Sequence, residues 1–467
     1  MNFLESLQTK DVFTENGMLT NSTTMNECVN LFFTIGAMRG QDKSRLLSMF
    51  SKSFNESPIT AMKILFWSRD VREGAGERQI FKDIIEFLAQ THPNELRKNI
   101  HLISEYGRWD DIFTLFGTEL EEDVLDLILS GLEKGDGLCS KWIPRKGVVF
   151  NKIRKRMKTT PKELRQLLVR LSNTVEQKMC AKEWQNIEYS KVPSLAMSRY
   201  TKVFTNRDQV GFASYLQSLK EGTTKVNAST LYPYDVIKTL QYGNQGLANE
   251  QWKALPNYME DSSERILPLV DVSGSMSTLI GGKGSVTCMD VSISLGMYIS
   301  ERIEGIFKDH FITFSSKPQL QKLLGNLNER FLQLQNASWG MNTNLEAVFT
   351  LILNKALENK VSESEMPTKI LIMSDMEFDE AQGGSFTAQE MIRHQYENIG
   401  YKMPDIIYWN IQSRNSNFPV KFDEKGTALI SGLSPSILKS ILGGEDLSPV
   451  KIMEETLNKV RYKDIKV

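Results

Sequence analysis

The sequence predicts a protein of class α + α/β, with an all-helical module over residues 1–255 and a doubly wound parallel-sheet domain over residues 256–467. Three observations predict this architecture. The chain has 467 residues, which is more than one compact core usually holds. The first half repeats apolar residues at the three- and four-residue spacing of helices. From about Arg265 onward, short apolar runs typical of buried strands alternate with helical stretches.

The helical module is predicted from a series of amphipathic stretches. Four of them are MNECVNLFFTIGAM, ITAMKILFWSRDV, ERQIFKDIIEFLAQ and TPKELRQLLVRLSNTV. The linkers are short and contain helix caps or breakers such as NESP, EGAG and HPN. Paired helices of this length are typical of a helical-repeat layer, although the sequence has no fixed period.

The second half is predicted to be a parallel sheet covered on both faces. Its expected strands are ILPLV, HFITFSS, KILIMSD, DIIYWNI and GTALISGL, and its expected helices include VTCMDVSISLGMYISERI, TNLEAVFTLILNKALEN and TAQEMIRHQYENIG, with two more at the C-terminus. Nearly continuous apolar strands indicate burial on both sides of the sheet. In such sheets ligands bind beyond the carboxyl ends of the strands.

Composition excludes several classes of protein. The hydrophobic content of 40% and the charged content of 24% are ordinary for a globular chain. No apolar run is long enough to span a bilayer and the N-terminus is too polar for a signal peptide, so a cytoplasmic protein is expected. The chain has four histidines and four scattered cysteines without a CxxC pair. We therefore expect reduced cysteines in the core and no zinc site.

Oxygen donors follow the first predicted strand at alternate positions. In LPLVDVSGSMST, a carboxylate and two hydroxyls come directly after the apolar run, and a loop threonine and a second strand-end aspartate follow later in the chain. Hard oxygen donors of this kind suit Mg²⁺ or Mn²⁺. The alternative is a turn held by side-chain-to-backbone hydrogen bonds. The predicted ligands are Asp271, Ser273, Ser275, Thr343 and Asp375.

Positive charge is concentrated between Lys141 and Lys225, with 19 lysines and arginines against six aspartates and glutamates. A basic face can simply be solvated, but the densest part, KWIPRKGVVFNKIRKRMKTTPKELRQLLVR, has 11 basic residues and one acid, which argues against ion-paired helix faces. An RNA surface is therefore predicted. The segment YSKVPSLAMSRYTKVFTNRD adds aromatic residues between its cations, a mixture that suits single-stranded RNA. The predicted RNA contacts are Arg145, Lys146, Lys152, Arg154, Lys155, Arg156, Lys158, Lys191, Arg199 and Lys202.

The pattern DxSxS, a loop threonine and a strand-end aspartate is similar to the metal-ion-dependent adhesion site of von Willebrand factor A domains. The resemblance covers residues 260–467 and includes all five positions. It departs at Asn344, where many A domains have Asp, but that residue is not a direct ligand in the pattern. The resemblance implies a Rossmann-like fold and an ion completed by an acidic residue of a partner protein, which is binding without catalysis.

A second resemblance is carried by FWSRDVREGAGER, YGRWDD, WIPRK and YSKVPSLAMSRY in the helical half and by WGMNTN, SDMEFD, YWN and SGLSPS in the second half. On these stretches, the helical half followed by such a domain resembles the Ro autoantigen, or TROVE-module, family of ring-shaped RNA-binding proteins. Closest are its poorly characterised relatives in viruses, microbes and plants. This resemblance implies HEAT-like repeats, RNA binding and a helical arc closed into a ring by the A domain.

Two of these helical motifs allow more than one interpretation. The arginines of FWSRDVREGAGER, Arg69, Arg72 and Arg78, either face an anion or pair with the neighbouring acids Asp70, Glu73 and Glu77. In YGRWDD, Trp109 is expected to anchor helix packing and not to stack on a base.

The sequence thus predicts a non-enzymatic ribonucleoprotein component without membrane association. Its expected partners are structured RNA or single-stranded RNA ends and an acidic protein ligand at the ion. The alternative is a metal-dependent protein-interaction scaffold or chaperone that binds no RNA. An enzyme is disfavoured because GxxxxGK(S/T), HExxH and a serine nucleophile elbow are absent, and GGKG at 281–284 lacks phosphate-loop spacing.

Overall fold

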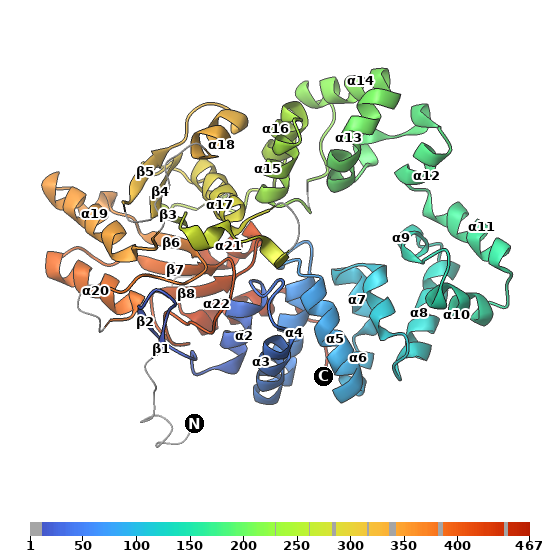
Figure 1. Cartoon of the computed structure of the whole chain (residues 1–467), viewed down its shortest axis with the longest axis horizontal. Coiled ribbons are helices and arrows are strands. Elements are labelled where there is room, and N and C mark those ends of the chain that lie inside the picture. Colours follow the sequence, from blue (N-terminus) through green and yellow to red (C-terminus); the bar gives the residue numbers. More distant parts are fainter. Residues whose placement is uncertain are drawn as a thin grey trace. The chain divides into compact units, whose positions relative to one another are not determined.

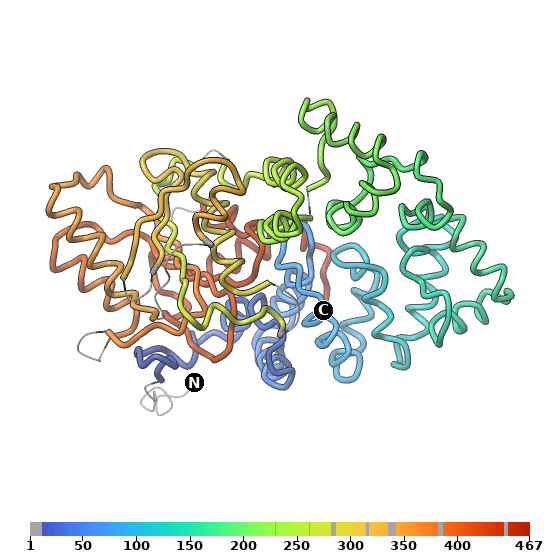
Figure 2. Tube along the Cα trace, turned by 45° about the horizontal axis from the view of Figure 1, so that its top comes forward, coloured from blue at the N-terminus to red at the C-terminus, as the bar shows by residue number. Residues whose placement is uncertain are grey.

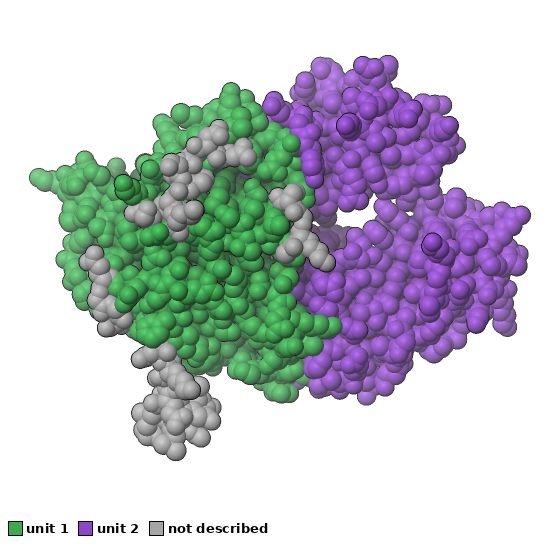
Figure 3. All heavy atoms as spheres, viewed as in Figure 1, with its two compact units in different colours: residues 1–57, 232–241, 257–459 green, residues 58–231, 242–256, 460–467 purple. Residues whose placement is uncertain are grey.

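A computed structural model describes residues 12–228, 230–260, 262–282, 286–314, 317–335, 342–381, 386–442 and 447–467 (Figure 1). The chain divides into two compact units, coloured separately in Figure 3. The first unit contains the chain up to Ser57, Tyr232–Gln241 and Asn257–Lys459, and the second contains Pro58–Leu231, Tyr242–Pro256 and Val460–Val467. We call them the sheet unit and the helical unit.

The sheet unit is built on six strands in the order β5-β4-β3-β6-β7-β8. All neighbouring pairs are parallel except β4 and β5. The predicted alternation of strands and helices is confirmed, and β3, β6 and β8 are buried along their whole length. The strands are β3 (Ile266–Asp271), β4 (His310–Phe314), β5 (Gln319–Lys322), β6 (Lys369–Ser374), β7 (Asp405–Asn410) and β8 (Thr427–Ser431).

The expectation of a wholly parallel sheet is wrong at one edge. β5 was not predicted, and it runs antiparallel to β4. Only four residues separate the two strands, and a connection this short permits a hairpin but not a parallel crossover. Three of the four residues of β5 are exposed, as on a sheet edge.

Helices flank the sheet. α17 packs on β3, β4 and β6 and contacts α15, whereas α2 packs on β8 and α22. The helices of the sheet unit are α2 (Glu27–Ile35), α3 (Lys43–Glu56), α15 (Pro233–Gln241), α17 (Cys288–Arg302), α18 (Leu327–Gln335), α19 (Leu345–Glu358), α20 (Ala388–Ile399), α21 (Leu438–Leu442) and α22 (Pro449–Leu457).

The N-terminal segment differs from the helical expectation for residues 1–255. It contains a short antiparallel hairpin, β1 (Val12–Phe13) and β2 (Leu19–Thr20), which bridges to Asp379, Thr387 and Phe418 in the sheet unit. Residues Leu31, Phe32 and Phe33 of α2 are fully buried. The change of unit after Pro256 lies beside the predicted boundary, but the chain up to Ser57 clusters with the sheet.

The helical unit consists of short helices that pack mainly on helices close to them in sequence, as the trace in Figure 2 shows. The predicted helicity of this part is confirmed. Its helices are α4 (Pro58–Arg69), α5 (Gln79–Thr91), α6 (Pro93–Arg97), α7 (Ile100–Tyr106), α8 (Glu121–Glu133), α9 (Gly137–Trp142), α10 (Val148–Arg156), α11 (Pro161–Ser172), α12 (Val175–Cys180), α13 (Ser194–Arg207), α14 (Gln209–Lys220) and α16 (Gln245–Lys253).

All four cysteines are free, and three of them are buried as expected, whereas Cys180 is exposed. Within the described ranges, every helix is too short or too polar to cross a membrane.

Candidate functional site

Two predicted ligands meet at the point where the strand order reverses. The chain runs from β3 to β4 on one side and later returns to β6 on the other side of β3. Asp271 is the last residue of β3, and Asp375 directly follows β6. Because ligands of open α/β sheets bind at such a switch point, this edge is the candidate site.

The carboxylate of Asp271 is fully buried and held by two hydrogen bonds. Its Oδ1 accepts from the backbone N–H of Ser273 at 2.9 Å, and its Oδ2 accepts from the hydroxyl of Ser374 at 2.6 Å. Burial, together with the nearby carboxylate of Asp375, raises the pKa of Asp271. A bound cation would offset this cost of burying two carboxylates together.

The two serine hydroxyls lie side by side after the strand. Ser273 precedes a 3₁₀ turn over Gly274–Ser277, and its Oγ is 3.0 Å from the Oγ of Ser275. Neighbouring oxygen ligands of an octahedral Mg²⁺ ion, each about 2.1 Å from the metal, are about 3 Å apart. The spacing of the hydroxyls therefore fits a shared hard cation.

Asp375 lies in a constrained loop. Its side chain is fully buried, and its Oδ2 accepts a 2.6 Å hydrogen bond from Nη2 of Arg414. The next residue, Met376, has a φ of 66°, which a non-glycine residue rarely adopts. Strained backbone of this kind often occurs at functional sites.

Thr343 is buried and joined to the same loop through its backbone. Its carbonyl accepts hydrogen bonds from the N–H groups of Leu345 at 3.1 Å and Asp379 at 3.0 Å. Asn344 caps α19 by accepting from the N–H of Ala347 at 2.8 Å. Residues up to 341 of the WGMNTN motif, and Lys283 and Gly284 of GGKG, lie outside the described residues.

The donor set decides which ions the site suits. In the part of the chain that the structure describes, no three His, Cys, Asp or Glu side chains are grouped as metal ligands. The candidate site instead combines two carboxylates with hydroxyl oxygens. Hard oxygen donors without imidazole or thiolate favour Mg²⁺ or Mn²⁺ over zinc.

Glu377, two residues beyond Asp375, was not singled out in the sequence. It is buried, and its Oε1 accepts from Nδ2 of Asn415 at 3.0 Å and of Asn417 at 2.8 Å. Its Oε2 accepts from the backbone N–H of Glu15 at 2.7 Å. Glu377 therefore ties the N-terminal hairpin to the loops beside the site.

Ser374 was also missed, although it directly precedes Asp375 in SDMEFD. Its hydroxyl is buried and donates to Asp271. The only sequence signal that could have identified Ser374 is its position as the last residue of a strand, β6, which pairs with β3.

The basic stretch is more strongly paired than the sequence indicated. Lys152 and Arg156 of α10 face α8, where Arg156 pairs with Glu122 and Asp126 at 2.7 Å each and Lys152 pairs with Glu121. The premise that ion-paired helix faces are excluded is therefore wrong, because the acids come from a helix about 30 residues earlier.

The remaining predicted RNA residues divide into engaged and open ones. The guanidinium groups of Arg145 and Arg154 donate to backbone carbonyls, Lys191 pairs with Glu188, and Arg199 lies beside the hydroxyl of Tyr200. Four exposed lysines have no ion pair with any described residue, and these are Lys146, Lys155, Lys158 and Lys202.

The aromatic residues of YSKVPSLAMSRYTKVFTNRD do not form a surface for stacking. Tyr189 and Phe204 are buried and pack edge-to-face at a ring distance of 5.2 Å, together with Phe212 and Tyr215. Tyr200 is half-buried against the same cluster. The interpretation of these rings as base-stacking partners is wrong, since packing between α13 and α14 uses them.

The arginines of FWSRDVREGAGER are engaged by acids and carbonyls. The buried Arg69 pairs with Asp111 at 2.7 Å, Arg78 pairs with Asp110 and Asp111, and Arg72 donates to the carbonyl of Glu105. Arg69 and Arg78 are therefore ion-paired, but the expected partners are wrong, because these pairs use Asp110 and Asp111 of YGRWDD instead of Asp70, Glu73 and Glu77.

Trp109 of YGRWDD is a packing residue, as expected. It is buried, and its Nε1 donates to the carboxylate of Asp136 at 3.1 Å.

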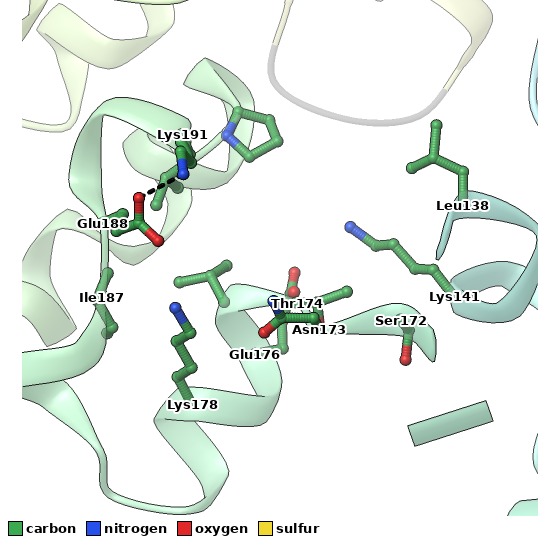
Figure 4. A pocket seen from close by; sticks show the side chains of 13 residues that line it. Leu138, Lys141, Ser172, Asn173, Thr174, Glu176, Lys178, Ile187, Glu188 and Lys191 are labelled. Atoms are coloured by element: carbon green, nitrogen blue, oxygen red, sulfur yellow. Dashed lines mark ion pairs between the residues drawn. The ribbon is translucent and has the colours of Figure 1, made fainter. Parts of the chain in front are cut away.

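One pocket of the helical unit lies within the basic region and has a volume of about 280 Å³ (Figure 4). Lys141 of α9 and Lys178 of α12 reach toward it from two sides, and Lys191 lines it while paired with Glu188. The ammonium group of Lys178 donates to the carbonyl of Asn186 at 2.7 Å. The walls of this pocket therefore combine the positive charge of the lysines with apolar side chains such as Ile187 and Val192.

The fold and site define a protein with a helical unit and an open α/β sheet unit that has an oxygen-rich switch point. Residues 266–466 match a family described as a domain of unknown function (DUF7788), and residues 14–124 and 148–264 match another so described (DUF2828). The chain is similar to the uncharacterized protein L728 of Acanthamoeba polyphaga mimivirus, with 29% identity over 510 aligned positions that cover 95% of this chain and 87% of the viral protein.

Proposed function

We propose that this chain is a non-enzymatic binding protein with two separate binding surfaces. The sheet unit holds one Mg²⁺ or Mn²⁺ ion and, through it, an acidic group of a partner protein. The helical unit binds RNA through its exposed cations. We also propose that the sheet unit is a von Willebrand factor A-like domain and that the helical unit is a HEAT-like module of the Ro, or TROVE-module, type. We propose a cytoplasmic location for the protein.

One observation carries the ion site: the switch point brings together the ends of β3 and β6, each with a buried aspartate, beside two serine hydroxyls 3.0 Å apart. Asp271, Ser273, Ser275, Thr343 and Asp375 would hold the ion. When bound, the ion would attract an acidic group of the partner protein. The five residues would orient the ion and exclude water from its buried side.

The ion site is tested by calorimetric titration of Mn²⁺ into the full chain. We expect one site in the wild type and its loss in Asp271→Ala and Asp271→Asn, because each removes a negative charge from the ligand set. Asp423→Ala removes an exposed aspartate of the same unit and should bind like the wild type. Absence of binding at millimolar Mn²⁺ in the wild type, or undiminished binding by both Asp271 variants, would refute the site.

RNA binding is supported by the open lysines. Lys155 lies in the last turn of α10 and Lys158 follows two residues after the helix ends. Both are exposed and have no ion pair among the described residues. Phosphate contacts by such residues release counterions, so affinity should fall steeply as salt rises. The pairing of Lys152 and Arg156 with α8 favours instead the scaffold or chaperone without RNA, because it neutralises part of the basic surface.

RNA binding is distinguished from the scaffold function by fluorescence anisotropy at low salt, with a labelled single-stranded RNA and a labelled RNA hairpin. We expect Lys155→Glu/Lys158→Glu to weaken binding by roughly tenfold and to flatten the salt dependence. Lys421→Glu/Lys425→Glu makes the same charge change at exposed lysines of the sheet unit and is the matched control. If the wild-type protein binds neither RNA, RNA binding is refuted and the protein-interaction scaffold or chaperone becomes the proposed function.

A further inference from the structure

The guanidinium group of Arg414 contacts Asp375, one of the predicted ligands of the candidate ion site. It follows β7 in the loop after Asn410, and its Nη2 donates to Oδ2 of Asp375 at 2.6 Å. Its Nη1 is 3.3 Å from the carboxylate of Glu15, which belongs to the N-terminal hairpin. The Asp375 side chain is fully buried, so this guanidinium is a direct counter-charge for a desolvated carboxylate.

The loop that contains Arg414 is fixed by the N-terminal segment. Nη1 of Arg45, from α3, donates to the carbonyls of Ser413 at 2.9 Å and Arg414 at 2.8 Å. Nη2 of Arg45 donates to the hydroxyl of Ser413 at 2.8 Å, and the N–H of Ser413 donates to the carbonyl of Ala37 at 2.9 Å. The position of Arg414 is therefore built into the fold and does not depend on a freely rotating surface side chain.

We propose that Arg414 is a built-in counter-cation of the ion site, which neutralises Asp375 in the ion-free protein and lowers the affinity for a divalent ion. This inference rests on the proposed ion site. A divalent ion that shares Asp375 with a guanidinium is repelled by it, and like charges this close in a buried setting interact strongly. Residues 12–57, which hold both Glu15 and Arg45, thereby influence ion affinity although they supply no ligand.

The test is a Mn²⁺ titration of the full chain by calorimetry and electron paramagnetic resonance. We expect Arg414→Gln to bind Mn²⁺ about tenfold more tightly than the wild type, because a positive charge is removed beside the ion. Arg414→Lys keeps the charge and should remain close to the wild type. Arg393→Gln removes an exposed arginine that pairs with Glu424 in the same unit, and it should leave the affinity unchanged.

Melting temperatures supply a readout that a purely packing role would not give. In EDTA, Arg414→Gln should melt below the wild type because buried Asp375 loses its counter-charge. In saturating Mg²⁺ the difference should shrink, since the ion replaces the guanidinium. A packing role predicts the same difference in both buffers.

The outcomes separate this inference from the ion site itself. If the wild type binds Mn²⁺ and Arg414→Gln binds it equally or more weakly, the counter-cation is refuted while the site stands. If only Arg414→Gln binds Mn²⁺, the counter-cation is supported and the wild-type site is refuted. If no variant binds Mn²⁺, both are refuted.

Discussion

The hydroxyl of Ser374 donates a 2.6 Å hydrogen bond to the carboxylate of Asp271, joining the ends of two adjacent parallel strands. Both side chains are fully buried. The same hydroxyl accepts from the N–H of Met376 at 3.1 Å, so one side chain fixes both the predicted ligand and the loop that contains Asp375.

Ser374→Ala should therefore affect stability and ion binding together. Removing the hydroxyl leaves Oδ2 of Asp271 without its buried donor, which should lower the free energy of unfolding by about 1–3 kcal/mol in EDTA. Mn²⁺ affinity should fall less than in Asp271→Ala because the charge remains. Urea unfolding and Mn²⁺ titration measure the two effects. The exposed Ser362→Ala should change neither, and a wild-type result for Ser374→Ala would contradict this role.

Arg69→Met should strongly destabilise the helical unit. Arg69 and Asp111 are 2% and 0% exposed, and Arg69→Met removes the charged donor from Oδ2 of Asp111, which among the described residues keeps only the N–H of Arg108 there. Loss of a buried hydrogen bond between charged groups should cost about 1.5–3 kcal/mol. Arg156→Met breaks exposed pairs and should cost less than about 1 kcal/mol. Urea unfolding followed by circular dichroism compares them. Equal small losses would show that Arg78 and Lys82, which lie 3.1 and 3.7 Å from Oδ1 of Asp111, are sufficient counter-charges without Arg69.

Asp235 should make the sheet unit less stable as pH rises. Burial raises the pKa of Asp235 from 3.8 to about 6. Because the folded pKa lies above the unfolded one, the contribution to stability is complete below about pH 4 and is lost as pH rises through about 6. Asp235→Asn keeps an acceptor for the N–H of Tyr232 and removes the charge. Its melting temperature should gain on the wild type between about pH 4 and 7, and a constant difference would contradict the shift.

The segment 256–467 should not fold stably alone. It lacks α2, whose Phe32 carbonyl accepts from the hydroxyl of Ser431 in β8 at 2.9 Å and whose apolar side chains are buried. Exposing that surface removes apolar burial from the sheet unit. We expect no cooperative thermal transition and strong binding of a hydrophobic dye, in contrast to the full chain. A cooperative melt near that of the full chain would show that residues 12–57 are dispensable.

Local sequence was sufficient to place Asp271 and Asp375 at the ends of two adjacent strands. The apolar runs before Asp271 and Asp375 predict buried strands, and strand–helix alternation predicts parallel neighbours, so both aspartates were expected at one edge. The prediction of a wholly parallel sheet was wrong only at β5, whose connection to β4 is too short for a crossover.

The sequence by itself determined the helical character of residues 58–231, the alternation of strands and helices after Arg265 apart from β5, and the oxygen donors at the ends of β3 and β6. These features depend on periodicity and on residues close together in the chain. Tertiary structure decided which charges meet. Arg156 pairs with acids of α8 that lie about 30 residues earlier in the chain, and Asp375 pairs with Arg414. The carboxylate of Glu377 accepts a hydrogen bond from the backbone N–H of Glu15, which is 362 residues away in the sequence. A charge in a sequence does not identify its partner, since pairing depends on which surfaces packing brings together.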